Sequence, residues 1–405
     1  MDITLQKSAL HKKSSIEITG SKSESNRLLL LQALFPEITL NNVSNSDDSN
    51  LMIKALASTE KVVDIHHAGT AMRFLTAYFS VQEGRATVLT GSKRMKERPI
   101  KILVDALRSL GADISYLEND GFPPIAIHGK QLTKNKVALK ANVSSQYISA
   151  LLLIASKLEN GIVLTLEGDI TSVPYINMTL SLLNEIGVKT SFINNVITVY
   201  PSETKSKPLT VESDWSSASY YFSIAAISDV GTEITLSSYK ENSLQGDSCL
   251  VDIYKHFGVT SKFKENTIVL TKETSLLQPL ILDLKNAPDI AQTIAVTCFV
   301  LGISCDLTGL HTLKIKETDR LVALKTEIEK LGGNVEITDK SLHLKASNTI
   351  KPEVSIETYN DHRMAMAFAP VALKQPVIIK ESAVVSKSYP TFWDDLKTLG
   401  FKITK

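Results

Sequence analysis

Six cationic residues stand at the starts of apolar helical patterns or beside strand patterns: Lys22, Arg27, Arg98, Arg320, Arg363 and Lys387. The chain around them is close to neutral, with 44 basic and 43 acidic residues, so no global field would draw it to nucleic acid or to an anionic membrane. Helix N-termini favour anions, and arginine holds carboxylates and phosphates through paired hydrogen bonds. The recurrence of these cations therefore predicts a local site for small anionic ligands.

Each motif in this set also has a structural explanation when it is taken alone. Gly20-Ser21-Lys22 is typical of a serine N-cap, and Ser144-Ser145-Gln146 of capping by hydroxyl groups. The stretch from Lys316 to Arg320 fits a capping box with Thr318 as the cap, and Asp289 follows a proline as an N-cap aspartate does. Only the joint pattern favours binding over capping.

A repeated pattern positions these residues. Five times, an amphipathic helix pattern ends in a large apolar residue and a glycine, followed by two short alternating segments, of which the last instance is truncated; the glycines are Gly111, Gly187, Gly258, Gly332 and Gly400. Each glycine stands where a helix C-cap needs a left-handed residue, and about 70 residues separate one from the next. A second type of helix, apolar on nearly every face, starts six times, at Ser21, Gly69, Ser144, Asp214, Asp289 and Asp361.

The two helix types predict a fold. Helices that are apolar on all faces must be buried, whereas the glycine-ended helices keep a charged face and are expected outside. We therefore predict an α/β protein of two lobes, each of three βαβαββ units with buried helices surrounded by mixed sheets, an inside-out α/β barrel. The lobes are expected to span 20–212 and 1–19 plus 213–405, with crossings near Thr19 to Ser21 and near Glu212 to Asp214.

Composition and the N-terminus exclude several other classes of protein. The three cysteines, Cys249, Cys298 and Cys305, form no CxxC pair and have no histidine at metal-ligand spacing, so we expect a reducing compartment and no metal site. The N-terminus lacks the apolar core of a signal peptide, and no apolar run reaches the roughly 18 residues of a membrane helix. These features predict a soluble cytoplasmic protein.

Eleven motifs occur together in the order and approximate spacing of the 5-enolpyruvylshikimate-3-phosphate synthases, which the chain resembles from Gly20 to Trp393. They are GSKSESNR, AGTAMR, RMKERPI, SSQ, SVPY, SSASY, QGD, PD, KETDR, NDHRMAM and SKSYPTFW. The resemblance implies a monomer with no metal and no organic cofactor, whose N-terminal strand belongs to the C-terminal half. It also implies transfer of the enolpyruvyl group of phosphoenolpyruvate to the 5-hydroxyl of shikimate 3-phosphate, with release of phosphate, in chorismate and aromatic amino acid biosynthesis.

The resemblance carries binding roles to the matching positions. Shikimate 3-phosphate would be held by Lys22, Ser23, Arg27, Ser144, Ser145, Gln146, Ser172, Tyr175, Asp289, Thr312 and Lys316. Phosphoenolpyruvate would be held by Lys22, Gly69, Arg98, Gln146, Arg320, Arg363 and Lys387. Together these sets contain all six cations selected above, as ligands with carboxylate and phosphate groups require.

The implied reaction needs an acid and a base. A proton must reach the methylene carbon of phosphoenolpyruvate while another leaves the attacking hydroxyl. The resemblance implies Glu317 as the acid, Asp289 as the base and Lys22 as a catalytic residue that touches both substrates. A protonated Glu317 would be opposed by its neighbours Lys316 and Arg320, so this assignment of the protons is a hypothesis.

Five residues depart from the family pattern, and two of them, Thr19 and Glu24, differ only from its common choices. His67 stands where asparagine usually precedes AGTAMR, Phe74 replaces a usual proline, and Thr312 replaces a usual substrate-contacting asparagine. Thr312 lacks an amide, so one hydrogen bond to the shikimate ring would be lost or made through water, at a cost of about 1 kcal/mol.

Two alternative functions remain open from the sequence. The related enolpyruvyl transferase that acts on UDP-N-acetylglucosamine is similar in fold but usually carries a reactive cysteine in the loop before its Arg-Pro, and residues 91–98 contain none. A binding protein that kept the fold and lost catalysis is the other alternative. It is disfavoured because the chain retains Lys22, Asp289, Glu317 and Arg320.

Overall fold

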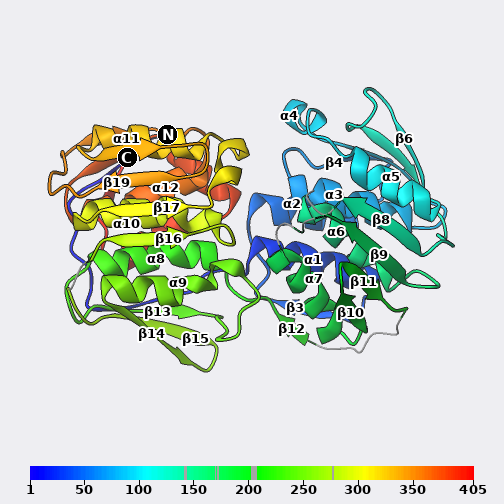
Figure 1. The fold of residues 1–405 in the computed structure, drawn as a ribbon, viewed down its shortest axis with the longest axis horizontal. Coiled ribbons are helices and arrows are strands. Elements are labelled where there is room, and N and C mark those ends of the chain that lie inside the picture. The colour runs from blue at the N-terminus through cyan, green and yellow to red at the C-terminus, as the bar shows by residue number, and fades with distance from the viewer. Residues whose placement is uncertain (141–143, 169, 171–172, 202–207, 276–277) are drawn as a thin grey trace. The chain divides into compact units, whose positions relative to one another are not determined.

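The structure is a computed structural model that describes residues 1–140, 144–168, 170, 173–201, 208–275 and 278–405. The chain divides into two compact units (Figure 1). The inserted unit is Gly20–Val211, and the terminal unit joins Met1–Thr19 to Glu212–Lys405. The predicted boundary after residue 212 is one residue late. Glu212 belongs to the terminal unit, because its buried carboxylate accepts hydrogen bonds there from Trp215 Nε1 at 2.8 Å and Ser243 Oγ at 2.7 Å.

The described strands form three sheets in each unit. The sheets of the terminal unit are β20 (Val354–Ile356), β21 (Val377–Ile379), β1 (Ile3–Leu5) and β22 (Ile403–Thr404); β14 (Val259–Lys264), β15 (Thr267–Lys272), β13 (Glu233–Ser237) and β2 (Lys13–Ile16); and β16 (Leu280–Asp283), β17 (Cys305–Thr308), β19 (Leu342–Lys345) and β18 (Asn334–Ile337). Those of the inserted unit are β4 (Val62–Asp64), β5 (Ala86–Thr90), β7 (Ile125–His128) and β6 (Asp113–Tyr116); β10 (Thr190–Ile193), β11 (Val196–Val199), β9 (Ile162–Glu167) and β8 (Lys136–Lys140); and the shortened pair β12 (Pro208–Thr210) and β3 (Thr39–Asn41).

Every four-stranded sheet has the same topology. Two neighbouring strands run parallel, as β4 and β5 do, and two more strands extend the sheet in antiparallel fashion, as β7 and β6 do. Parallel neighbours need a crossover connection, which the buried helices supply, and antiparallel neighbours need only a hairpin. This confirms the prediction of mixed sheets built from a repeated unit.

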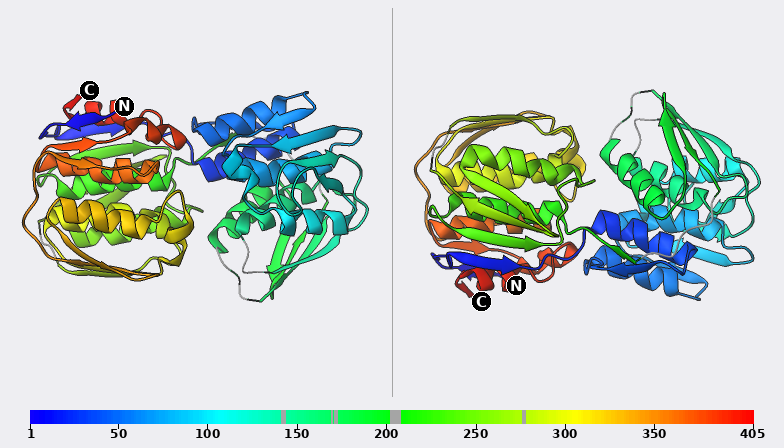
Figure 2. Two further views of the ribbon diagram at one scale, coloured as in Figure 1. Left: turned by 90° about the horizontal axis from the view of Figure 1, so that it is seen from above. Right: turned by 90° about the horizontal axis from the view of Figure 1, so that it is seen from below.

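Six helices are buried on nearly all faces and lie between the sheets (Figures 1 and 2). They are α1 (Lys22–Leu34), α3 (Gly69–Ser80), α6 (Ser145–Ala155), α8 (Trp215–Ile227), α10 (Ala291–Leu301) and α12 (His362–Phe368). In α10, for example, only Leu301 is not buried. The predicted arrangement of buried helices surrounded by sheets is therefore confirmed.

The remaining helices and turns connect the sheets. They are α2 (Asp47–Ala57), α4 (Lys93–Lys96), α5 (Lys101–Leu110), α7 (Val173–Glu185), α9 (Leu250–Ile253), α11 (Arg320–Lys330) and α13 (Phe392–Leu399), with the 3-10 helices η1 (Gly246–Cys249), η2 (Tyr254–Phe257), η3 (Pro288–Ile290), η4 (His311–Ile315), η5 (Ala369–Leu373) and η6 (Ser382–Lys387). The five predicted helix-ending glycines all have positive φ, from 72° at Gly258 to 110° at Gly111 and Gly400. They adopt the left-handed conformation that the C-cap requires.

The two ends of the chain meet in one sheet. Strand β1 pairs antiparallel with β21, where Ile3 lies opposite Ile379, and with β22, where Leu5 lies opposite Ile403. Figure 2 shows both termini on the terminal unit. The N-terminal strand thus completes the last repeat, which the sequence shows as truncated after Gly400.

The crossings between the units run beside each other within the terminal unit. The backbone N–H of Asp214 donates to the carbonyl of Thr19 at 3.3 Å, and the hydroxyl of Ser213 donates to the carbonyl of Ile18. These bonds tie the outgoing and returning segments together where they leave the sheet that contains β2. None of the helices in the described part of the chain combines the length and apolarity that a bilayer crossing requires.

Candidate active site

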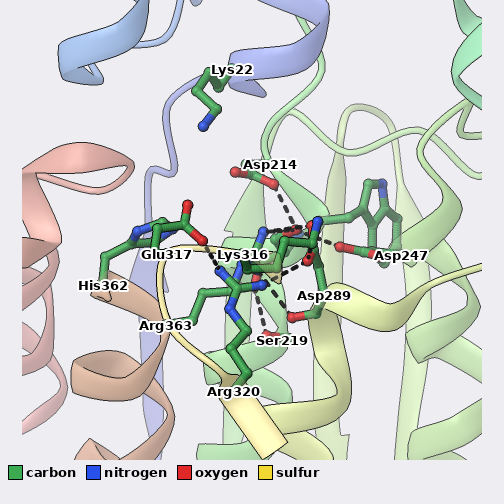
Figure 3. A network of polar contacts seen from close by, with 12 residues as sticks. Lys22, Asp214, Ser219, Asp247, Asp289, Lys316, Glu317, Arg320, His362 and Arg363 are labelled. Atoms are coloured by element: carbon green, nitrogen blue, oxygen red, sulfur yellow. Dashed lines mark hydrogen bonds and ion pairs between the residues drawn. The ribbon is translucent and has the colours of Figure 1, made fainter. Parts of the chain in front are cut away.

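Arg320 is the centre of an ion-pair cluster in the terminal unit (Figure 3). It begins α11, and its side chain is 2% exposed. Its Nε donates to Asp361 Oδ2 at 2.7 Å, Nη1 to Asp289 Oδ1 at 2.8 Å and Nη2 to Glu317 Oε2 at 2.8 Å. The planar guanidinium is therefore held in one orientation by three carboxylates.

Asp289 lies among three cations. Besides Arg320, Lys316 Nζ lies 3.2 Å from Oδ1 and Arg363 Nη2 lies 3.3 Å from Oδ2. Burial raises the pKa of the Asp289 carboxyl, but Arg363, Lys316 and Arg320 together outweigh burial and hold that pKa well below its usual value. The carboxylate is ionised and forms ion pairs with all three cations. An incoming anion would compete with Asp289 for these cations.

A strained turn before α12 carries two further parts of this site. Tyr359 and Asn360 both have left-handed backbones, with φ of 53° and 57°. Lys387 Nζ donates to the backbone carbonyl of Asn360 at 2.7 Å and to its Oδ1 at 2.8 Å, and the fully buried Asp361 follows. The hydroxyl of Tyr359 donates to the buried Glu327 at 2.5 Å, which ties the turn to α11. Such strain is typical of functional sites whose surroundings over-determine the backbone.

Two of the capping explanations are wrong in this unit. The N-cap of α11 is Asp319, whose Oδ1 accepts from the N–H groups of Leu321 and Val322 at 3.2 Å each, and not Thr318. Asp289 caps no helix, since Ala287 takes the N-cap position of η3. The Asp289 carboxylate is available for the cations instead.

Arg27 is a buried cation of the inserted unit. From the second turn of α1, its Nε donates to Thr179 Oγ1 at 2.8 Å, its Nη2 to Ser149 Oγ at 3.0 Å and its Nη1 to the carbonyl of Ser23 at 2.7 Å. Ser149 belongs to α6 and Thr179 to α7. The guanidinium thus joins the N-terminal turns of three helices of this unit.

Two aromatic rings flank the same guanidinium. The Arg27 Cζ lies 5.5 Å from the ring centre of Phe74 and 5.9 Å from that of Tyr175. Burial lowers the pKa of Arg27 to about 10, so it remains a cation at neutral pH. Phe74, one of the departures from the family pattern, therefore has a physical role as a cation–π partner.

Gly69 and Arg98 are in van der Waals contact. A β-carbon built on Gly69 would lie 2.5 Å from Arg98 Nη1, so only glycine lets the guanidinium pack at this distance. Arg73, also buried, donates to the carbonyls of Gly69 and Pro99 at 3.1 Å each. It holds both neighbours of the Arg98 side chain in place.

The other predicted residues of the inserted unit lie at the same helix starts. Lys22 opens α1, with its Nζ 3.6 Å from Asp48 Oδ2. Ser144 is the N-cap of α6 and accepts from the N–H of Gln146 at 3.4 Å, while Ser145 is buried at the first helical position. The capping explanation is correct for Ser144, and it leaves the Gln146 side chain to donate to Thr70 Oγ1 at 3.2 Å.

Two predicted residues need separate mention. Ser172 lies outside the described residues. Thr312 lies in η4 of the terminal unit, and its Oγ1 is buried with no hydrogen-bond partner among the residues that the structure describes. An orphaned buried hydroxyl is the kind of group that a polar ligand can satisfy.

Sequence reasoning missed four residues that support these side chains: Arg73, Ser216, Asp247 and Asp361. All lie within motifs already selected, AGTAMR, SSASY, QGD and NDHRMAM. For Arg73, Ser216 and Asp361 the signal that could have found them is a charged or polar residue at the start of an apolar helix, because such a residue is placed there at low cost only when it is paired. Asp247, in η1, carries no such signal.

Known proteins resemble the chain over most of its length. A family model described as EPSP synthase (3-phosphoshikimate 1-carboxyvinyltransferase) matches residues 55–396. A 3-phosphoshikimate 1-carboxyvinyltransferase of Bacteroides fragilis is 48% identical over 396 residues, which is 96% of each chain. The chain belongs to the EPSP synthase family. Another member, the 3-phosphoshikimate 1-carboxyvinyltransferase of Vibrio campbellii, is 37% identical over 95% of this chain and 96% of its own.

The fold of the EPSP synthase family is also seen directly. A solved structure of EPSP synthase from Acinetobacter baumannii matches with a TM-score of 0.84 over 100% of both chains, at 20% sequence identity. The two chains share one fold although four residues in five differ.

Proposed function

We propose that the chain transfers the enolpyruvyl group of phosphoenolpyruvate to the 5-hydroxyl of shikimate 3-phosphate, giving 5-enolpyruvylshikimate 3-phosphate and phosphate. The protein is a 3-phosphoshikimate 1-carboxyvinyltransferase of the shikimate pathway, by its relation to named members of the family. The observation that carries the substrate assignment is that three cations, Lys316, Arg320 and Arg363, converge on the carboxylate of Asp289.

The cations of the terminal unit would bind phosphoenolpyruvate. Arg320 and Arg363 provide planar pairs of donors for its carboxylate and phosphate, and Lys387 provides a point charge. From the inserted unit, Lys22, Arg98 and the backbone at Gly69 would take part. Arg98 is supported for this role by its close packing on Gly69.

Shikimate 3-phosphate would be held mainly through α1 and α6. The N-terminal N–H groups of α6, with the hydroxyls of Ser144 and Ser145, suit a phosphate group. Arg27 and Tyr175, already in contact, would take the shikimate ring and its phosphate. Thr312 would offer its unpartnered hydroxyl to the ring.

The strength of Asp289 as a base would increase as the anion binds. A carboxyl whose pKa is well below normal is a weak base, and Asp289 is in that state beside its three cations. When phosphoenolpyruvate takes hydrogen bonds from Arg320 and Arg363, Asp289 loses part of this stabilisation and becomes the stronger base that the substrate hydroxyl requires.

Glu317 would respond to the same event. Its carboxylate accepts from Arg320 Nη2 at 2.8 Å, and an anion bound to Arg320 would weaken that contact. Loss of the cation makes a carboxyl easier to protonate, which favours Glu317 as the acid that delivers a proton to the methylene carbon.

The test is phosphate release by the purified protein. Phosphoenolpyruvate and shikimate 3-phosphate should release phosphate together and neither should do so alone. An Asp289→Asn variant, prepared in parallel, controls for contaminating phosphatase. Release with UDP-N-acetylglucosamine in place of shikimate 3-phosphate would overturn the substrate assignment, and no release with either acceptor would favour a binding protein that has lost catalysis.

A further inference from the structure

Asp247 is connected to Arg363 through the hydroxyl of Ser216. Figure 3 shows Asp247 on the side of Arg363 that carries Asp289 and Asp214 as well. Ser216 is the second residue of α8, and its backbone N–H donates to the N-cap residue Asp214 at 2.9 Å. Its hydroxyl donates to Asp247 Oδ2 in η1. The hydroxyl oxygen of Ser216 in turn accepts a hydrogen bond from Arg363 Nη2 at 3.2 Å.

The direction of these bonds follows from their chemistry. A serine hydroxyl has one proton and two lone pairs, whereas an ionised carboxylate only accepts. Ionised Asp247 therefore accepts a hydrogen bond from the Ser216 hydroxyl, and a lone pair of the Ser216 oxygen is left to accept from Arg363. The negative charge of Asp247 also stabilises the Arg363 cation, together with that of Asp289.

Among the contacts of the Arg363 side chain, the hydrogen bond to Ser216 is one that the proposed reaction does not alter. In the described part of the chain, the other side-chain contacts of Arg363 go to Asp289, whose backbone carbonyl lies at 3.2 Å and whose Oδ2 lies at 3.3 Å. In the proposed reaction the charge interactions of the Asp289 carboxylate change, so the contact of Arg363 with Oδ2 cannot stay constant, and the backbone carbonyl of Asp289 holds only one side of the guanidinium. The hydroxyl of Ser216, on a buried helix, can hold the arginine in a constant place.

We propose that Asp247, acting through the hydroxyl of Ser216, is a positioning residue that orients Arg363 toward phosphoenolpyruvate. The inference rests on the proposed function, which assigns phosphoenolpyruvate as the anion that Arg363 binds. Asp247 itself touches no substrate in this scheme. Its loss should therefore weaken binding of one substrate and leave the chemical step largely intact.

The charges around Asp247 make its effect depend on pH. Burial and the carboxylates of Asp289 and Asp214 raise the pKa of Asp247 to about 6, although Arg363 and the hydrogen bond from Ser216 act against them. The thiol of Cys249, in the same turn, also lies near Asp247, and its own pKa is raised to about 12 by burial and by that carboxylate. Asp247 is thus charged at neutral pH and loses its charge in mildly acidic solution, while Cys249 stays neutral.

The experiment compares Ser216→Ala and Asp247→Asn with the matched control Ser223→Ala. Ser223 lies on the same helix, is equally a serine, and is buried with its hydroxyl accepting from Thr297 Oγ1 at 2.7 Å, away from Arg363. Steady-state kinetics would be measured for both substrates below and above the Asp247 pKa of about 6. Melting temperatures would establish that each variant folds.

Above that pH, both test variants should raise the KM for phosphoenolpyruvate about tenfold, the loss expected for one hydrogen bond to a charged group. Their kcat and their KM for shikimate 3-phosphate should stay within about twofold of the parent, as should all constants of Ser223→Ala. Below the pKa, the difference between Asp247→Asn and the parent should shrink, because the parent then also carries a neutral side chain.

Several results would overturn the inference. An unchanged KM for phosphoenolpyruvate in the folded variants, equal losses for both substrates, or a pH-independent effect of Asp247→Asn would each do so. If the parent releases no phosphate, the proposed function fails and this assignment fails with it. If the parent is active and the variants match it, only the positioning role is refuted.

Discussion

Replacing Gly69 by alanine should weaken phosphoenolpyruvate binding by displacing Arg98. The new β-carbon would lie 2.5 Å from Arg98 Nη1 and 3.0 Å from both Cζ and Nη2, and these are its three nearest atoms. Non-bonded heavy atoms prefer about 3.5 to 4.0 Å, so the guanidinium must retreat by about 1 Å. Arg73 holds the carbonyls on both sides, at Gly69 and Pro99, which prevents the backbone from absorbing the shift.

The expected magnitude follows from the hydrogen bond that is lost. A hydrogen bond to a charged group contributes about 1.5 to 3 kcal/mol, and 1.4 kcal/mol corresponds to a factor of ten. The KM for phosphoenolpyruvate should therefore rise about 10- to 150-fold, while the KM for shikimate 3-phosphate stays near that of the parent. Coupled measurement of phosphate release at varied phosphoenolpyruvate gives both constants.

A double-mutant cycle tests the cause. The effect of Gly69→Ala should largely vanish when Arg98 is already alanine, because the clash acts through that side chain. The same loss in both backgrounds would show that alanine acts by another route. A change of less than about twofold in the single variant would mean that Arg98 has room to move, and the steric argument would fail.

Three further predictions concern the terminal unit. Glu317→Gln should lower kcat about 10²- to 10⁴-fold, which is the usual contribution of a general acid, with little change in either KM. A near-normal rate constant in a single-turnover assay would show that Glu317 takes no part in the chemical step. Asp247→Asn should raise the melting temperature at pH 8, by roughly 2 to 4 °C for each kcal/mol gained. The folded-state pKa of Asp247, about 6, exceeds the ordinary 3.8, so the stability that its protonated form contributes is complete below pH 3.8 and is lost as the pH rises through 6. Calorimetry below pH 3.8 and at pH 8 should therefore find a higher melting temperature for the variant only at pH 8. Thr312→Asn should lower the KM for shikimate 3-phosphate about fivefold, or about 1 kcal/mol, by restoring an amide; an unchanged KM would show that Thr312 does not face that substrate.

The repeated architecture could be predicted because its signals are local. Apolar residues on every face of α10 require burial wherever the helix lies, and a left-handed C-cap at Gly258 follows from the residues on either side of it. The same reasoning located the helix starts where the cations stand. It could not show that β1 completes the last sheet, since pairing between Leu5 and Ile403 leaves no local trace.

The candidate site, like the fold, has features that the sequence determines and features that only the tertiary structure determines. Its residue types, and the need for several cations in a nearly neutral chain, follow from the sequence, and the family motifs extend this to a reaction. Only the tertiary structure pairs Arg320 with Asp361, gives Asp289 three cations in place of a helix to cap, and brings Asp247 to Arg363 through Ser216. The physical reason is that an ion pair depends on distances of a few ångströms between groups far apart in the chain, and the packing of the buried helices determines those distances.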